Sequence, residues 1–117
     1  MSRPAIPNDQ RLIVALDLPS GNEARELVET LGDSVSFYKV GLELFTGADG
    51  FAVVDWLSAH DKQVFVDLKF FDVPATVARA VKQLRGRNIT FATVHGNDAI
   101  MRAAAEVSGD VGILAVT

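Results

Sequence analysis

The sequence predicts an α/β fold, namely the first five strands and four helices of a closed (β/α)8 TIM barrel. Short apolar segments alternate with amphipathic segments of about 10–15 residues, which is typical of βαβ units and a parallel sheet. The loop after the first predicted strand contains DLPSGN and lacks the GxGxxG pattern common in doubly wound open sheets. Barrel enzymes carry their chemistry at the carboxyl ends of several strands. Polar residues stand near that end of every predicted strand: Asp17, Lys39, Asp67 with Lys69, Thr93 with His95, and Thr117.

Five short apolar runs bounded by turn residues are predicted as strands. They are residues 11–17, 35–41, 63–70, 89–95 and 112–117.

The segments between these strands are predicted as four helices. The first begins at a capping box of Ser20 and Glu23 and ends at Gly32. The second covers roughly 47–60, with Thr46 and Asp49 near its start. The others cover 74–85, with Pro74 in the first turn, and 98–108.

The composition of the chain argues against several classes of function. A net charge of −4 without a basic stripe argues against a nucleic-acid partner. The absence of cysteine excludes disulfides and thiolate metal sites. No run of about 18 apolar residues predicts a membrane span, and the polar start MSRPAIPNDQ lacks a secretory signal. We therefore expect a cytoplasmic protein without membrane partners.

The predicted barrel is incomplete. A full barrel needs eight strands and about 250 residues, whereas this chain has 117 residues. We expect residues 1–117 to be the N-terminal portion of a single TIM-barrel domain. By itself this portion would leave two apolar sheet edges unpaired, and it should associate or be incompletely stable.

Charged residues interrupt the apolar run VFVDLKFFDVPATV at 64–77. Strand alternation places Asp67 and Lys69 on one face, pointing into the barrel, and Val64, Val66, Leu68 and Phe70 on the helix-covered face. The same parity directs Asp17 and Lys39 inward, so that four charges converge on one cavity. A self-neutralising ion-pair network is the alternative interpretation, although buried ion pairs stabilise proteins poorly compared with apolar packing.

Four further polar residues have two interpretations each. Asp72 and Thr76 are either capping residues of the helix led by Pro74 or functional groups. His95 is either a rim residue or a buried histidine, and Thr93 is interpreted as a rim hydrogen-bond donor without catalytic importance. No His, Asp and Glu set has convincing metal-ligand spacing, although spacing alone leaves His95 with Asp67 open.

Three motifs together resemble the orotidine 5'-monophosphate decarboxylase superfamily. DLKFFDVP at 67–74 fits the D-x-K-x-x-D signature, and YKVG at 38–41 and ALD at 15–17 match two further motifs in order. The resemblance covers nearly the whole chain. Many members have His at the position of Phe71 and Asn at that of Ala75, neither of which is a charged catalytic position.

The resemblance implies a metal-free and cofactor-free carboxy-lyase that converts orotidine 5'-monophosphate to UMP and CO2. Lys69 would donate a proton to C6 of the pyrimidine, Asp67 would lie beside the substrate carboxylate, and Lys39 would contact the ribose. Asp17 would bind ribose hydroxyls. Asp72 and Thr76 would reach into the partner's site across a homodimer interface.

Two alternatives remain beside this expectation. One is a Mg²⁺-dependent sugar-phosphate decarboxylase or aldolase of the same superfamily, although those relatives tend to have glycine at the position of Pro74. The other is a non-catalytic partial barrel that assembles through its edges. The family's phosphate-binding segment and pyrimidine lid follow the fifth strand, so we expect residues 1–117 alone to be nearly inactive.

Overall fold

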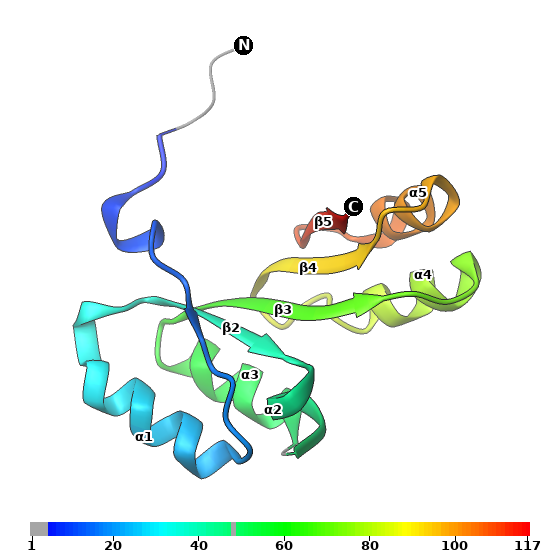
Figure 1. The fold of residues 1–117 in the computed structure, drawn as a ribbon. Coiled ribbons are helices and arrows are strands. Elements are labelled where there is room, and N and C mark those ends of the chain that lie inside the picture. The colour runs from blue at the N-terminus through cyan, green and yellow to red at the C-terminus, as the bar shows by residue number, and fades with distance from the viewer. Residues whose placement is uncertain (1–4, 48) are drawn as a thin grey trace.

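The five strands form one parallel sheet whose spatial order, β1-β2-β3-β4-β5, follows the sequence (Figure 1). The computed structural model describes residues 5–47 and 49–117. A doubly wound sheet reverses direction at a switch point, which breaks the sequential strand order. The uninterrupted order instead matches one continuous arc of a barrel wall. The predicted fold class is therefore confirmed.

The elements alternate as the sequence predicts. The strands are β1 (Val14–Ala15), β2 (Phe37–Gly41), β3 (Gln63–Phe70), β4 (Ile89–His95) and β5 (Gly112–Val116). The helices are α1 (Gly21–Leu31), α2 (Leu42–Gly47), α3 (Gly50–Ala59), α4 (Pro74–Lys82) and α5 (Asp98–Val107). Two short 3-10 helices lie at Asn8–Gln10 and Gly32–Ser34.

One helix was not predicted. The helix expected over roughly 47–60 is observed as α3, which begins at Gly50, but a short helix, α2, precedes it and ends at Gly47, with residue 48 outside the described part of the chain. The described residues therefore contain five α-helices instead of four. Thr46 belongs to the end of α2, where its hydroxyl donates to the carbonyl of Leu42. A Cβ at Gly47 would lie 2.6 Å from the Pro19 carbonyl oxygen, so the chain passes too close there for any larger residue.

The first strand is shorter than predicted. Residues 11–17 were expected, yet only Val14 and Ala15 pair, with Tyr38 and Lys39 of β2. By contrast, β3 and β4 have their predicted bounds.

The predicted capping box and glycine stop of the first helix are confirmed, and Asp49 lies at the start of α3. The Ser20 hydroxyl accepts a hydrogen bond from the Glu23 amide and donates to the Glu23 carboxylate, which fixes the start of α1. The Asp49 carboxylate accepts from the amide of Ala52 at the start of α3. Gly32 ends α1 with a positive φ of 52°, a conformation that glycine adopts without steric cost.

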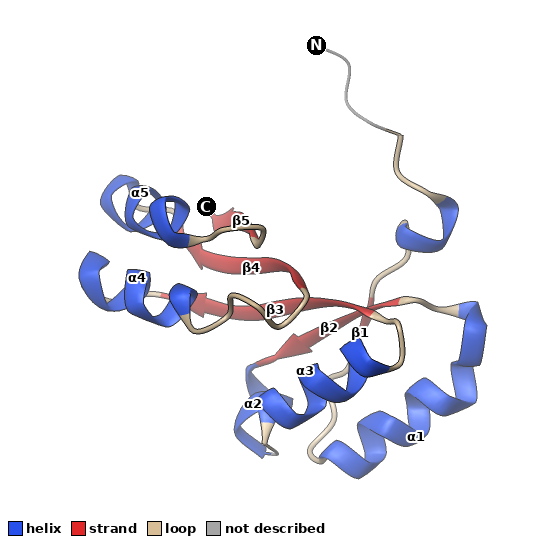
Figure 2. Cartoon of the chain, turned by 180° about the vertical axis from the view of Figure 1, so that it is seen from behind, coloured by secondary structure: helices blue, strands red, loops and turns tan. Residues whose placement is uncertain are grey.

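The core lies between the sheet and its helices, which occupy the same side of the sheet in two opposite views (Figures 1 and 2). Val64 and Val66 of β3 are buried in the main apolar cluster, and Leu68 and Phe70 pack against it. The helix-facing half of the strand alternation is therefore confirmed. A smaller cluster joins α4, α5 and Val94 of β4.

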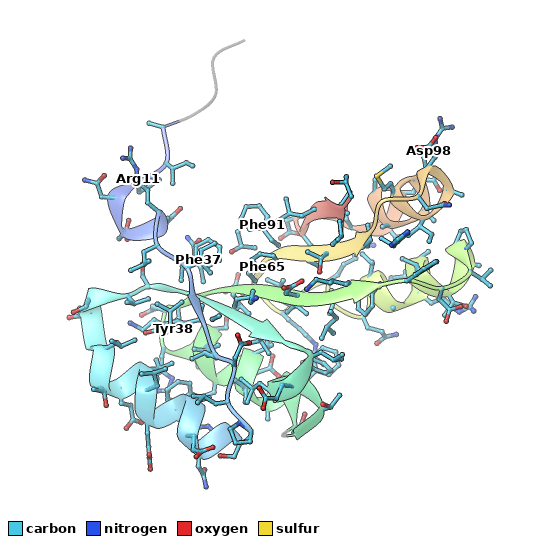
Figure 3. All side chains as sticks on the ribbon, in the orientation of Figure 1. Arg11, Phe37, Tyr38, Phe65, Phe91 and Asp98 are labelled. Atoms are coloured by element: carbon cyan, nitrogen blue, oxygen red, sulfur yellow. The ribbon has the colours of Figure 1, made fainter. Side chains whose placement is uncertain are left out.

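The opposite, concave face of the sheet carries an aromatic group near the amino ends of the strands (Figure 3). The rings of Phe37 and Phe91 stack with centroids 6.0 Å apart, and Phe65 meets Phe91 edge-on at 6.1 Å. Gly112 on β5 leaves room for this group, since a Cβ there would lie 2.7 Å from the Phe91 ring. The aromatic group thus forms an apolar layer beneath the polar carboxyl ends of the strands.

Among the described residues, no helix combines the length and the apolar character required to cross a membrane.

Tyr38 provides a test of the core. Its side chain is fully buried, and its hydroxyl has no hydrogen-bond partner within residues 5–47 and 49–117; burial raises its pKa. We expect Tyr38→Phe to raise the free energy of unfolding by about 1 kcal/mol, because it removes an uncompensated polar group. Tyr38→Ala should lower it by about 3–5 kcal/mol. Urea unfolding at fixed protein concentration measures both, and destabilisation by Tyr38→Phe would contradict the expectation.

Candidate active site

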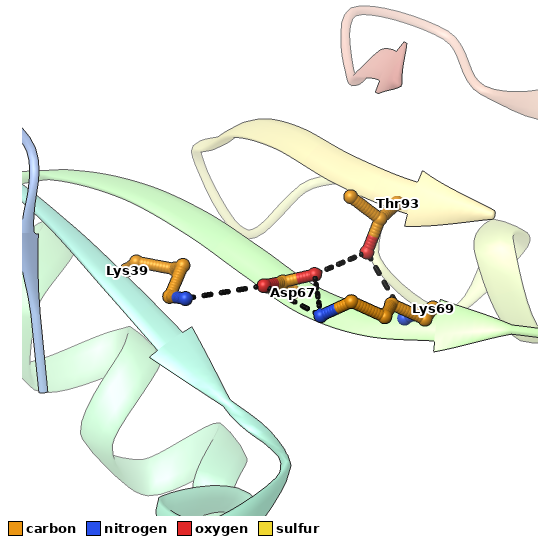
Figure 4. Close-up of polar contacts among 4 residues, drawn as sticks. All are labelled: Lys39, Asp67, Lys69 and Thr93. Atoms are coloured by element: carbon orange, nitrogen blue, oxygen red, sulfur yellow. Dashed lines mark hydrogen bonds and ion pairs between the residues drawn. The ribbon is translucent and has the colours of Figure 1, made fainter. Parts of the chain in front are cut away.

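Asp67 is the centre of a polar cluster on the concave face of the sheet (Figure 4). Lys69 Nζ lies 3.0 Å from both carboxylate oxygens of Asp67, and Lys39 Nζ lies 3.2 Å from Oδ2. The Thr93 hydroxyl donates to Oδ1 at 2.8 Å. The Asp67 side chain is only 9% exposed, whereas that of Lys69 is 59% exposed. A nearly buried carboxylate thus holds an ammonium group that solvent and ligands can reach.

Neighbouring strands supply these groups because parallel pairing aligns their carboxyl ends. Lys39 belongs to β2 and Thr93 to β4, on either side of the β3 residues Asp67 and Lys69. In the register of β2 and β3, Gly41 lies opposite Asp67. Gly41 also lies beside Asp17, whose Oδ1 would be 3.5 Å from a Cβ at that position.

The backbone of β3 departs from regular pairing at the site. Val66 pairs with Ala92 and Phe70 with Val94, so three β3 residues oppose the single residue Thr93. Within this bulge Lys69 has φ 49°, a left-handed conformation that costs a non-glycine residue about 1–2 kcal/mol. The Lys69 amide donates to the Thr93 hydroxyl oxygen at 2.9 Å. Backbone strain and catalytic candidates therefore occur in the same three residues.

The surroundings of Asp67 favour its ionised form. Burial alone would raise the pKa of Asp67. Hydrogen bonds from Thr93, Lys69 and Lys39, together with the positive charge of Lys69, outweigh burial and lower the pKa below its ordinary value.

Four of the predicted site residues line one pocket. The pocket has a volume of about 370 Å³, and its lining consists of Asp17, Lys39, Gly41, Leu42, Asp67, Leu68 and Lys69. The convergence of Asp17, Lys39, Asp67 and Lys69 that strand parity predicted is therefore observed. Their individual roles stay predictions.

Asp72 and Thr76 lie outside this pocket. The N-cap of α4 is Val73, and no side chain caps that helix, so the capping interpretation of Asp72 is wrong. Its carboxylate accepts from the adjacent Val73 amide, and the Thr76 hydroxyl accepts from Arg79. Asp72 is exposed and therefore available to a group outside this chain.

Thr93 is a hydrogen-bond donor, as interpreted from the sequence, but its contacts with Asp67 and the Lys69 backbone were not predicted. It is 6% exposed and contacts both Asp67 and the Lys69 backbone, so it belongs to the cluster itself. Side-chain alternation along residues 89–95 could have predicted that Thr93 lies on the concave face, on the strand next to Asp67. It could not have predicted that Thr93 lies opposite a bulge in β3. His95 is exposed and stacks on Phe71 with centroids 4.1 Å apart, which supports the rim interpretation of His95.

No group of three or more His, Asp or Glu side chains in the described ranges is arranged to hold a metal ion. The pairing of His95 with Asp67 that spacing left open therefore has no third ligand among those residues.

The lowered pKa of Asp67 predicts a pH dependence of stability. A carboxyl group with a lowered folded-state pKa stabilises the fold above its ordinary pKa of about 4 and loses that contribution as pH falls through the folded-state pKa. We expect the wild-type chain to be more stable than Asp67→Asn at pH 7, and the difference to shrink below about pH 4. Chemical unfolding between pH 7 and pH 3 measures this.

Asp55→Asn is the matched control, since Asp55 forms an ion pair with Arg87 but its side chain is 57% exposed. Its effect should stay within about 0.5 kcal/mol. A wild-type advantage over Asp67→Asn that is the same at pH 7 and pH 3 would contradict the assignment.

The chain is similar to known proteins over its whole length. It is 68% identical over 117 residues to the orotidine 5'-phosphate decarboxylase of Methylococcus capsulatus and 51% identical over 121 residues to that of Stenotrophomonas maltophilia. Both alignments cover 100% of this chain, but they cover only 48% of the Methylococcus capsulatus protein and 50% of the Stenotrophomonas maltophilia protein. The chain thus spans about half the length of these curated relatives.

Solved structures agree with this similarity. Orotidine 5'-phosphate decarboxylase from Lactobacillus acidophilus matches with a TM-score of 0.81 and 37% identity, covering 91% of this chain and 52% of that one. The Methanocaldococcus jannaschii enzyme, complexed with the inhibitor BMP, matches with a TM-score of 0.80 and 27% identity, covering 91% and 51%. The model of the orotidine 5'-phosphate decarboxylase / HUMPS family matches residues 10–117. This chain, with its Asp67-centred cluster on a parallel barrel wall, belongs to that family.

Proposed function

We propose that this chain forms the N-terminal, catalytic portion of an orotidine 5'-phosphate decarboxylase, which converts orotidine 5'-monophosphate to UMP and CO2 in pyrimidine biosynthesis. The observation that carries the proposal is the Lys69 ammonium, which is exposed toward the pocket while a buried carboxylate holds it at 3.0 Å. Membership of the family and the names of its relatives support the same reaction.

The proposed reaction needs a proton donor at a defined position. The bond between C6 of the pyrimidine and its carboxylate breaks, the electron pair stays on C6, and CO2 leaves. The resulting carbanion has no conjugated group to accept its charge, so a nearby ammonium both stabilises it and supplies the proton. Lys69 would donate that proton from Nζ to C6 and regain one from solvent.

Asp67 and Lys39 would prepare this donor. Asp67 holds Lys69 Nζ through both carboxylate oxygens, and its lowered pKa keeps it ionised near neutral pH. Beside a substrate carboxylate, Asp67 would repel the ground state, and the repulsion would end as CO2 departs. Binding energy from remote parts of the substrate would offset this cost. Lys39 balances the Asp67 charge from the other side and would contact the ribose.

The remaining assignments concern ribose binding and assembly. Asp17, which lines the same pocket, would accept hydrogen bonds from ribose hydroxyls. Asp72 and Thr76 would complete the site of a second subunit in a cytoplasmic homodimer. Their position outside the pocket of their own chain supports this assignment. No metal or organic cofactor takes part in the proposed reaction.

A chimera tests the catalytic assignment. We would replace the matching segment of the Methylococcus capsulatus relative with this chain and follow orotidine 5'-monophosphate decarboxylation by ultraviolet absorbance. We expect the chimera to turn over, and Lys69→Ala to lower kcat by about 10²–10⁴-fold because the proton donor is lost. Lys82→Ala, which removes an exposed lysine from the last turn of α4, should leave kcat unchanged.

Three further results would count against the proposal. Full activity of Lys69→Ala would exclude Lys69 as the donor. Loss of activity on treatment with EDTA would favour the Mg²⁺-dependent sugar-phosphate enzymes of the superfamily. A folded chimera without any turnover would favour a non-catalytic role in assembly.

Mixing two inactive variants tests the role of Asp72 across the interface. Lys69→Ala and Asp72→Asn chimeras should each be nearly inactive. If each site takes Lys69 from one subunit and Asp72 from the other, random heterodimers contain one intact site. Unfolding and refolding the mixture should then restore about 25% of the unmutated activity. A mixture as inactive as its components would show that both residues act within one subunit.

A further inference from the structure

We propose that Thr93 is a positioning residue that fixes the Lys69 ammonium and the Asp67 carboxylate in their reactive arrangement. The expected effect of Thr93 on catalysis rests on the proposed function. The positioning of Asp67 and Lys69 by Thr93 is argued from the contacts within the cluster and does not depend on that function. Thr93 does not line the pocket, so it would act through its neighbours and not by touching substrate.

A single oxygen of Thr93 makes both contacts. A hydroxyl group has one hydrogen to donate and lone pairs to accept. Thr93 uses the hydrogen toward Asp67 Oδ1 at 2.8 Å and a lone pair toward the Lys69 amide at 2.9 Å. Lys69 is thereby held at both ends, since its amide bonds to Thr93 directly and its ammonium bonds to the carboxylate that Thr93 orients (Figure 4).

The bulge explains why a side chain is needed here. Between the pairs Val66–Ala92 and Phe70–Val94, β4 offers one residue to three residues of β3. Regular ladder bonds cannot satisfy every backbone group in such a stretch. The Thr93 hydroxyl accepts from the Lys69 amide, and this bond supports the left-handed backbone at φ 49°. Without the hydroxyl, the strained residue would lose its restraint on that side.

Burial and side-chain stiffness make Thr93 suited to this role. At 6% exposure, its hydroxyl is shielded from competing water. The β-branched side chain has few χ1 rotamers, so the oxygen is held in place. The charged groups that face Asp67 are Lys39 from β2 and Lys69 from β3, with Asp17 in the same pocket. Thr93 is an uncharged contact of Asp67. It therefore orients the Asp67 carboxylate without changing the net charge of the cluster.

Two substitutions in the chimera separate the hydroxyl from the rest of the side chain. Thr93→Val keeps the shape and removes both hydrogen bonds, whereas Thr93→Ser keeps the hydroxyl. We expect Thr93→Val to lower kcat by about 10–100-fold with little change in KM, as misplacement of a reacting group would. Thr93→Ser should recover most of the loss. Thr90→Val, on the same strand near its other end, should leave kcat unchanged.

A measurement without substrate tests the geometry independently. With ¹³C-labelled aspartate, the carboxyl resonance of Asp67 reports its titration, and the Lys69 amide resonance reports the bulge. Thr93→Val should raise the pKa of Asp67 and shift the Lys69 amide, whereas Thr93→Ser should do neither. These shifts remain measurable if the chimera does not decarboxylate orotidine 5'-monophosphate. Failure of the proposed function can therefore be distinguished from failure of the positioning role of Thr93.

The proposal is wrong if Thr93→Val leaves both kcat and the two resonances unchanged. It is also wrong if Thr93→Ser is as impaired as Thr93→Val, because the methyl packing and not the hydroxyl would then matter. Thermal unfolding of all variants must accompany the kinetics. A loss of kcat that follows only the unfolded fraction would likewise reject a positioning role.

Discussion

The carboxylate of Asp67 is the group on which the rest of the site depends. A nearly buried carboxylate is costly unless charges and hydrogen bonds compensate it. Here the compensation comes from Lys39, Lys69 and Thr93, which belong to three adjacent strands. The strands must therefore pair in one register for the carboxylate to be stable. A shift in the register of these strands would consequently also disrupt the geometry of the site.

The two faces of the sheet divide stability from chemistry. Val64 and Val66 point toward the helices and contribute apolar burial. Asp67 and Lys69 point to the concave face, above the aromatic layer formed by Phe37, Phe65 and Phe91. Strand alternation makes this division possible within eight residues of β3. The charges thus avoid the helix-facing core, where their desolvation would have no compensation.

Local signals predicted well wherever the deciding interaction lies within a few residues. The capping box at Ser20 is an example, as are the bounds of β3 and β4. Predictions were incomplete where distant segments meet. The short helix α2 was not predicted, and its last residue, Gly47, lies close to the Pro19 carbonyl, a contact that the local periodicity does not encode. Likewise, only two of the seven residues predicted for the first strand pair with β2, and this pairing depends on a segment more than 20 residues away.

The sequence by itself determined the alternation of strands and helices, the inward direction of Asp67 and Lys69, and the likeness to a decarboxylase family. These properties follow from side-chain periodicity and from motifs contiguous in the chain. Only the tertiary structure decided that Thr93 bonds to both residues and that Lys69 takes a left-handed backbone. Thr93 is 26 residues from Asp67 in sequence. Their contact depends on a bulge that shifts the register between β3 and β4, and a pattern with a period of two does not encode such a shift.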